Sequence, residues 1–134
     1  LKLPCDVLAP CAIPMAIHSR NAEDIQARLI VEGAHGPVSP RADAILNRRG
    51  IPVVPDILAN GGGVVVSYFE WIQNRTGYAW IEDVVASRLR RYMREAWDAT
   101  RATQEEYDCS LRSATHILAV RRVAEAESSR GVYA

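Results

Sequence analysis

The sequence has 134 residues, of which 49% are hydrophobic and 24% are charged, so it suits one ordinary folded domain or part of a larger one. Lys plus Arg and Asp plus Glu each number 16, so no net charge attracts nucleic acid or an anionic membrane. No apolar run approaches the roughly 18 residues of a membrane-spanning helix. We therefore expect a soluble, cytoplasmic protein with neither a nucleic-acid partner nor a membrane partner.

The cysteines and histidines do not indicate a disulfide framework or a metal site. Cys5, Cys11 and Cys109 are odd in number and include no CxxC pair, and the three histidines lack ligand-like spacing. We expect reduced thiols and no bound metal. The chain begins with Leu1 instead of methionine, which is compatible with a fragment or with a processed piece.

Short apolar runs alternate with helical patterns in the first half of the chain. Three runs are short enough to be buried strands: 5–10, 29–32 and 51–54. Between them we predict a helix near 21–28, capped by Asn21, and a helix near 40–49, stopped by Gly50. By the right-handed crossover rule, this βαβαβ series predicts a three-stranded parallel sheet with helices on its faces.

Residues 64–74 fit two patterns. Three consecutive valines favour a strand, whereas the helical period would place on one face Val64, Ser67 and Trp71. We prefer the helix. Three adjacent glycines precede this segment, and we interpret them as a place where the backbone packs closely against another group, because the flanks are too apolar for a flexible linker.

The rest of the chain is predicted to be helical. Apolar residues recur every three or four positions from Glu82 to about Tyr107, and Ser110 is placed to cap a last helix ending near Ala126. We expect residues 128–131 to fray. The first of these helices carries a basic group that is typical of a solvated helix face more than of a phosphate site: Arg88, Arg90, Arg91 and Arg94.

The loops after parallel strands meet at one edge of the sheet, and ligands bind there. Three loops are expected to converge at that edge: 10–12, 33–36 and 60–62. Their small residues would let a ligand approach the backbone closely. His35 lies in one of these loops, where an incidental histidine and a functional one fit equally well. The sequence contains no GxGxxG phosphate loop after a strand.

Four runs resemble the C-terminal part of glutamate dehydrogenase, within the wider glutamate, leucine, phenylalanine and valine dehydrogenase family. They are Val31–Pro37, Val53–Val64, Val66–Asn74 and Leu118–Ala126. The family shares an Asn-x-Gly-Gly-Val loop, which begins here at Asn60, and the Ser-Tyr-Phe-Glu-Trp segment that follows resembles the glutamate enzymes. The resemblance covers nearly the whole chain.

The resemblance implies an α/β fold that holds the second half of a Rossmann-like parallel sheet (βαβαβ) followed by C-terminal helices. Residues 1–74 would form the C-terminal half of the dinucleotide-binding domain. Residues 75–134 would form a helical tail that packs back on a substrate domain outside this chain. The implied reaction is the oxidative deamination of L-glutamate to 2-oxoglutarate and ammonia, with NAD or NADP as cofactor, in an enzyme that assembles as a homo-oligomer, a hexamer.

The resemblance also implies roles for particular residues. Those on the nicotinamide and ribose side would be Cys11, Ala12, Gly33, Ala34, His35 and Asn60. Val64 would form an apolar wall of the substrate pocket, and the hydroxyl of Ser67 would bind the side-chain carboxylate of glutamate. The family's catalytic lysine and aspartate belong upstream of this segment. We therefore expect no catalytic residue in the chain and no activity from the chain alone.

Three departures from the family pattern lie near the implied nicotinamide site. His35 stands where Asn is usual, Gly61 where Ala is usual, and residues 13–15 where a more polar triplet is usual. An imidazole and a carboxamide differ in size and in their pattern of hydrogen-bond donors. These departures favour an alternative function, an inactive half-domain remnant that acts at most as a binding or interaction module.

Overall fold

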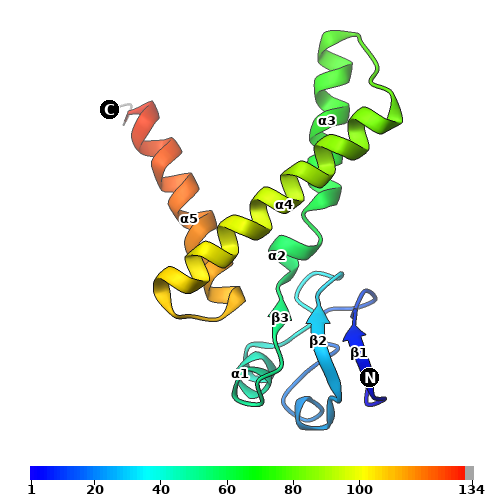
Figure 1. The fold of residues 1–134 in the computed structure, drawn as a ribbon, viewed down its shortest axis with the longest axis vertical. Helices are drawn as coiled ribbons and strands as arrows, with labels where there is room; N and C mark the ends of the chain where they lie inside the picture. Colours follow the sequence, from blue (N-terminus) through cyan, green and yellow to red (C-terminus); the bar gives the residue numbers. More distant parts are fainter. Residues whose placement is uncertain (132–134) are drawn as a thin grey trace.

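The computed structural model describes residues 1–131. Within this range the strands and the first helices build a small lobe, and three longer helices extend from it (Figure 1). In chain order the elements are β1 (Cys5–Leu8), the 3₁₀ helix η1 (Ala22–Asp24), β2 (Ala27–Val31), α1 (Pro40–Arg48), β3 (Val53–Val54), α2 (Asp56–Ala59), α3 (Gly62–Thr76), α4 (Glu82–Tyr107) and α5 (Leu111–Arg130).

The three strands form a parallel sheet in the order β1-β2-β3, which confirms the predicted sheet. Val7 pairs with Leu29 across β1 and β2, and Ile30 pairs with Val53 across β2 and β3. The strand bounds differ from the prediction: β1 ends at residue 8, β2 begins two residues early, and β3 has only two residues. Buried residues from β2, β3, α1 and the segment before β2 make the core, among them Ile17, Ile25, Ile30, Leu46 and Val53.

The predicted helix over residues 21–28 is wrong. Only η1 forms there, and the Asn21 side chain does not cap it. Instead, Asn21 Oδ1 accepts from the His18 N–H at 2.8 Å, and its Nδ2 donates to the Ala16 carbonyl at 2.9 Å. Ile25 and Ala27 are both buried with an exposed residue between them, and this alternation is that of a strand.

The predicted helix near 40–49 is confirmed as α1. Ser39 is its N-cap, since its side chain accepts from the Ala42 N–H, and Pro40 occupies the first turn. Gly50 follows the helix with a φ of +70°, a left-handed conformation that suits glycine. The Arg49 guanidinium then donates to the carbonyls of Ala22 and Ile25 at 2.6 and 2.7 Å, so the end of α1 is fastened to the turn that replaces the predicted first helix.

The three long helices match the predicted helical half of the chain. Residues 64–74 lie within α3, so the helix is confirmed there and the strand alternative is wrong. The observed bounds of α4, Glu82 and Tyr107, are those predicted. Ser110 caps α5 by accepting from Ser113 N, as predicted. However, α5 continues to Arg130, so residues 128–130, which were expected to lie beyond the helix, belong to it.

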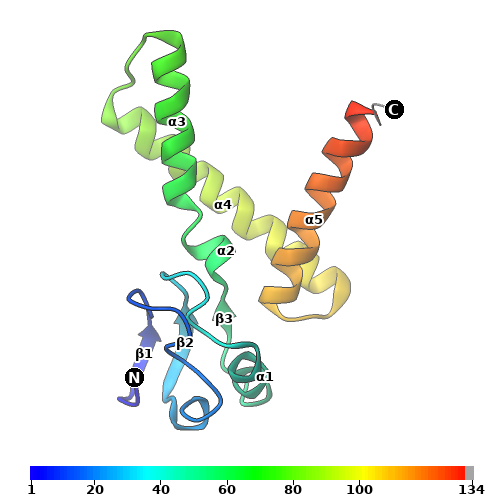
Figure 2. The ribbon, with the colours of Figure 1, turned by 180° about the vertical axis from the view of Figure 1, so that it is seen from behind.

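The helix α4 is the longest element and holds the other two long helices together. It packs along α3 near one end and meets α5 near its other end, while the sheet lobe lies below α2 (Figure 1 and, from behind, Figure 2). Phe69 of α3 is buried between the rings of Trp80 and Tyr92, with centroid separations of 5.6 Å to each. None of the helices within residues 1–131 combines the length and apolar character needed to cross a membrane.

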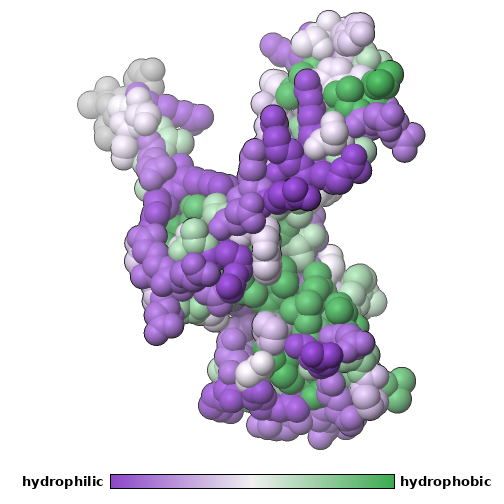
Figure 3. Space-filling model, in the orientation of Figure 1, coloured by the Kyte–Doolittle hydropathy of each residue, from purple (hydrophilic) through white to green (hydrophobic). Residues whose placement is uncertain are grey.

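Apolar residues remain on the surface near the carboxyl ends of the strands. Figure 3 shows apolar atoms gathered around α2 and the adjoining loops. Ile13, Met15 and Ile57 are 61%, 56% and 44% exposed, respectively. The apolar surface therefore lies at the edge of the sheet where ligands were expected.

Candidate functional site

The three loops at the carboxyl ends of the strands converge, as predicted. The N–H groups of Gly33 and Ala34 donate to the Pro10 carbonyl at 3.2 and 2.9 Å, which joins the first two loops. The Asn60 side chain joins the third, because its Nδ2 lies 3.4 Å from the Gly33 carbonyl oxygen and 3.5 Å from that of Ala34. Backbone pairing of β1 with β2 and of β2 with β3 brings the loops to this edge.

The small residues at this edge also serve the packing between loops. A Cβ atom added to Gly33 would lie 2.5 Å from Cys11 Sγ, far inside contact distance. Glycine at this position thus lets the first loop lie against the second. The Cys11 side chain is exposed, so its thiol lies at the surface beside the Gly33 backbone.

A cavity of about 640 Å³ lies beside these loops. It brings together three of the predicted site residues, His35, Asn60 and Val64, from two loops and the start of α3. The other lining residues are Asp56, Ile57, Gly61, Val65, Tyr68 and Tyr92. The remaining predicted residues are not in this lining: Cys11, Ala12, Gly33 and Ala34 belong to the adjoining loops, and Ser67 lies exposed one turn after Val64.

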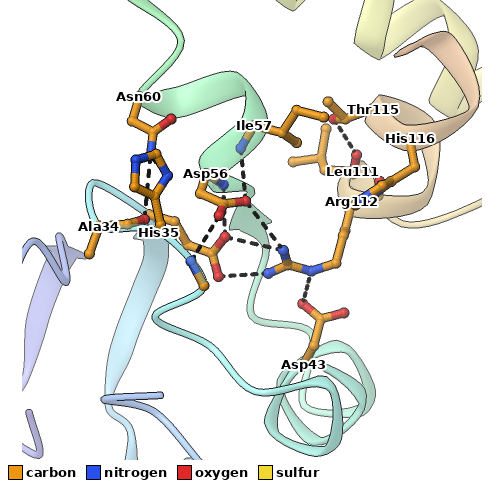
Figure 4. Close-up of polar contacts among 12 residues, drawn as sticks. Ala34, His35, Asp43, Asp56, Ile57, Asn60, Leu111, Arg112, Thr115 and His116 are labelled. Atoms are coloured by element: carbon orange, nitrogen blue, oxygen red, sulfur yellow. Dashed lines mark hydrogen bonds and ion pairs between the residues drawn. The ribbon is translucent and has the colours of Figure 1, made fainter. Parts of the chain in front are cut away.

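His35 and Asn60 are in direct contact at the C-terminal end of α2. The Asn60 Nδ2 lies 3.2 Å from His35 Nδ1 and also faces the carbonyl oxygens of Gly33 and Ala34. Figure 4 shows the Asn60 oxygen on the opposite side, pointing away from His35 and Ala34. Within residues 1–131 this oxygen accepts no hydrogen bond from the protein.

Asp56 lies between the loop of His35 and the start of α2. Its carboxylate accepts from the backbone N–H groups of Gly36 and Ile57, each at 2.8 Å. Burial of the carboxyl group would raise its pKa, but these two hydrogen bonds lower it. The positive charge of Arg112 lowers it further, so the pKa of Asp56 lies below its ordinary value.

Glu32 is fully buried at the end of β2 and is neutralised by an arginine from the last helix. Its Oε1 accepts from Arg112 Nη2 at 2.7 Å, and its Oε2 accepts from Arg112 Nη1 at 3.1 Å. The same Oε2 also accepts from the Asp56 N–H at 2.8 Å. A bidentate pair of this kind fixes the relative orientation of both side chains. The start of α2 is therefore tied to α5 through one carboxylate (Figure 4).

Arg112 also donates through Nε to the Asp43 carboxylate of α1 at 2.9 Å. Burial of the guanidinium would lower its pKa, but the hydrogen bonds with Glu32 and Asp43 raise the pKa of Arg112 above its ordinary value. We call Glu32, Asp43, Asp56 and Arg112 the carboxylate–arginine cluster. It joins four elements beside the cavity.

The carboxylate–arginine cluster was missed in the sequence. Glu32 and Asp56 follow two neighbouring strands directly or after one proline, and polar residues at the carboxyl ends of strands are a signal of a site. Arg112 gave no signal, because its partner Glu32 is 80 residues away in sequence. Only the folded structure brings the two together.

The basic group on α4 lies at the surface, away from the cavity. The arginines of α4 lie exposed; Arg88 stacks on Trp80 with 3.9 Å from its guanidinium carbon to the ring centroid, and Arg91 pairs with Glu95 at 3.7 Å. This is the predicted solvated helix face. Among residues 1–131, no group of three or more His, Cys, Asp or Glu side chains is arranged to hold a metal ion.

An open parallel sheet with converging loops and a cavity at its carboxyl edge defines an open-sheet α/β protein, the class in which ligands bind at that edge. The chain belongs to the Glutamate/Leucine/Phenylalanine/Valine dehydrogenase family, whose sequence profile matches residues 1–131. Within that family it corresponds to the C-terminal part of glutamate dehydrogenase, as the resemblance predicted.

Three relatives support this position in the family. Glutamate dehydrogenase of Thermotoga maritima is 50% identical over 133 residues, which are 99% of this chain and 32% of the relative. NAD-specific glutamate dehydrogenase of Staphylococcus aureus is 45% identical over 130 residues, which are 97% of this chain and 31% of the relative. The crystal structure of hetero-hexameric glutamate dehydrogenase from Thermus thermophilus with leucine bound superposes with a TM-score of 0.94 at 34% identity, over 99% of this chain and 32% of that one.

The chain therefore spans about a third of the length of the relatives it matches. The predicted fold class is confirmed by the parallel sheet, the long helices after it and the superposition on the Thermus thermophilus enzyme.

Proposed function

We propose that this chain forms the nicotinamide side and one substrate wall of a glutamate dehydrogenase. The reaction is the NAD- or NADP-dependent oxidative deamination of L-glutamate to 2-oxoglutarate and ammonia. One observation carries the proposal: His35, Asn60 and Val64 line one cavity at the carboxyl edge of the sheet. The family membership and the 50% identity to a glutamate dehydrogenase support it.

The cofactor contacts we propose are Cys11, Ala12, Gly33, Ala34, His35 and Asn60. A nicotinamide ring carries a carboxamide whose NH₂ group needs acceptors, and Asn60 Oδ1 is an acceptor that makes no hydrogen bond within the described residues. The cofactor, when bound, accepts a hydride from the substrate. The NAD-specific relative from Staphylococcus aureus favours NAD over NADP.

The substrate contacts we propose are Val64 and Ser67 at the start of α3. The two residues are exposed and lie three positions apart on one helix face, and Val64 is 74% exposed. Val64 offers an apolar surface to the methylene groups of glutamate. The Ser67 hydroxyl can donate to its side-chain carboxylate. No group for the proton transfers is proposed in this chain.

We further propose that residues 1–74 are half of a dinucleotide-binding domain and that residues 75–134 are a tail that packs on a substrate domain. The second range includes residues 132–134, which lie outside the described residues. The hetero-hexameric relative favours an oligomer, and we propose a hexamer formed with the rest of the polypeptide.

A graft tests the proposed function. We would replace the matching segment of the Thermotoga maritima enzyme with residues 1–131 of this chain, which share 50% identity with it. We expect glutamate-dependent reduction of NAD or NADP by the graft, measured by absorbance of the reduced nicotinamide, and no turnover by the 134-residue chain alone. A folded hexameric graft without turnover would overturn the proposal.

The same graft tests Ser67. Ser67→Ala removes a hydrogen bond to a charged group, so kcat/KM for glutamate should fall by about 10- to 100-fold while that for leucine does not. Ser87→Ala, on the exposed face of α4, is the matched control. An unchanged preference for glutamate over leucine would contradict the role of Ser67.

The inactive remnant remains the second candidate function, and the departures at His35, Gly61 and residues 13–15 favour it. Calorimetry of the folded graft with NADH separates the two candidates. Binding together with turnover excludes the remnant. A graft that folds as a hexamer but neither binds NADH nor turns over would support it.

A further inference from the structure

The orientation of the Asn60 carboxamide is set by two backbone carbonyls. Its Nδ2 faces the carbonyl oxygens of Gly33 and Ala34, at 3.4 and 3.5 Å. Carbonyl oxygens only accept hydrogen bonds, so the NH₂ group must be the side of the amide that faces them. The oxygen is then the group that Asn60 presents outward (Figure 4).

This orientation requires one protonation state of His35. The Asn60 NH₂ group also meets His35 Nδ1 at 3.2 Å, and an amide nitrogen can only donate. For this contact to be a hydrogen bond, His35 Nδ1 has to accept, and the neutral ring does so when it carries its proton on Nε2. An imidazolium has N–H groups on both nitrogens. Protonation of His35 would place two donors against each other and break this contact.

A protonated His35 has an attractive partner nearby. The titratable groups that line the same cavity are Asp56, Tyr68 and Tyr92. Phenols ordinarily stay neutral below about pH 9, whereas Asp56 has a pKa below its ordinary value and remains a carboxylate. Asp56 belongs to the element that follows β3, and Gly36, the neighbour of His35, already donates to it. Histidine is the side chain that ordinarily changes charge between about pH 5 and pH 8.

We propose that His35 is a pH-responsive positioning residue for Asn60. The neutral imidazole holds the Asn60 carboxamide with its oxygen outward, ready to accept from the amide of a nicotinamide nucleotide. The imidazolium turns toward Asp56 and releases Asn60, so the site binds such a ligand less tightly in acid. The identity of the ligand rests on the proposed function, but the coupling between the two side chains does not.

Nuclear magnetic resonance of the 134-residue chain tests the coupling directly. The His35 ring and the Asn60 side-chain NH₂ group would be followed from about pH 8.5 to about pH 5. We expect the neutral ring to carry its proton on Nε2, and the Asn60 signals to shift with the same midpoint as the ring. His35→Asn should abolish that shift, and the control His116→Asn, at an exposed site on α5, should retain it. A neutral ring with its proton on Nδ1, or Asn60 signals that ignore His35, would overturn the proposal.

Binding of NADH to the graft tests the consequence, with the fluorescence of the reduced nicotinamide as readout. We expect its Kd to rise about tenfold on acidification through the histidine range, the effect of one lost hydrogen bond, and to stay flat in His35→Asn. An equal rise in His35→Asn would overturn the role of His35. If NADH binds at no pH, the proposed function fails instead, and the resonance experiment still decides the coupling.

Discussion

Arg112 is the side chain that fastens the C-terminal helices to the edge of the sheet. It donates to both oxygens of Glu32, whose side chain is fully buried, and to Asp43. A buried charge is costly unless it is paired, and the Glu32 side chain is shielded from bulk solvent. Removing Arg112 should therefore destabilise this region more than removing one partner of an exposed ion pair would.

We expect Arg112→Ala to lower the free energy of unfolding by about 3–5 kcal/mol, because it leaves the Glu32 carboxylate buried and unpaired. Urea denaturation followed by circular dichroism measures the loss. Arg121→Ala is the control, since Arg121 pairs with Glu106 at 3.5 Å at an exposed site and its removal should cost less than about 1 kcal/mol. Equal losses in the two variants would contradict the role given to Arg112.

Asp56 makes the stability of the chain depend on pH in the acid range. Its pKa is lower in the folded state than in the unfolded state, so its contribution is complete above the unfolded value and is lost as pH falls through the folded value. Asp56→Asn should therefore destabilise the protein at pH 7, by about 1–3 kcal/mol. The difference from the unmodified chain should shrink below about pH 4, as measured by urea denaturation at each pH. A difference that stays constant with pH would contradict this.

The sequence could predict which residues gather at the cavity but not what holds them there. The order of strands and loops was sufficient to place His35 and Asn60 at the carboxyl edge of the sheet, and both line the cavity there. The hydrogen bond between them depends on side-chain directions that no periodicity encodes. Arg112 could not be predicted at all, because an exposed-looking arginine in a helix gives no sign of a carboxylate 80 residues earlier.

At the scale of the elements, local signals predicted the helices well wherever caps and period agreed. Pro40 and Gly50 bound α1, and the long apolar period gave the observed ends of α4. The failure over 21–28 has a physical cause: Ile25 and Leu29 suit a helix at i and i+4, but Ile25, Ala27 and Leu29 also suit the alternation of a strand. Burial of these side chains in the folded protein stabilises the strand from Ala27 onward.

The N-cap of α1 gives a test at this scale. Ser39 is buried, and its hydroxyl accepts from the Ala42 N–H at 3.2 Å. Ser39→Ala leaves that donor without a partner, so we expect a loss of about 1–2 kcal/mol in the free energy of unfolding. Thermal denaturation measures it, with Ser87→Ala at an exposed helical position as the control. Two indistinguishable melting temperatures would rule out a capping role.

At the scale of the whole molecule, α3 presents an apolar face that no other part of residues 1–131 covers. Val64 is 74% exposed, and Tyr68 and Trp71, which stack with ring centroids 5.9 Å apart, are 51% and 55% exposed. Exposed apolar groups that lie together favour association. The small sheet lobe and the long helices offer no further layer to bury this face.

We expect the isolated chain to self-associate with rising concentration, and Trp71→Lys to reduce that association by at least several-fold. Sedimentation velocity measures both. Asn74→Lys adds the same charge to an exposed polar position of α3 and should leave association unchanged. If Trp71→Lys and Asn74→Lys behave alike, net charge and not the apolar face governs the association.

The pair of Arg112 and Glu32 also has a consequence for the order of folding. The two residues are 80 apart in sequence, whereas Arg121 and Tyr107, which join α4 to α5, are 14 apart. Closing the longer loop costs about 1.5 kcal/mol more in chain entropy, so we expect this pair to form after the transition state. Arg112→Ala should then accelerate unfolding while leaving the refolding rate nearly unchanged, as stopped-flow kinetics in urea would measure. The arginine would thus set the lifetime of the folded chain, and not the speed at which it forms.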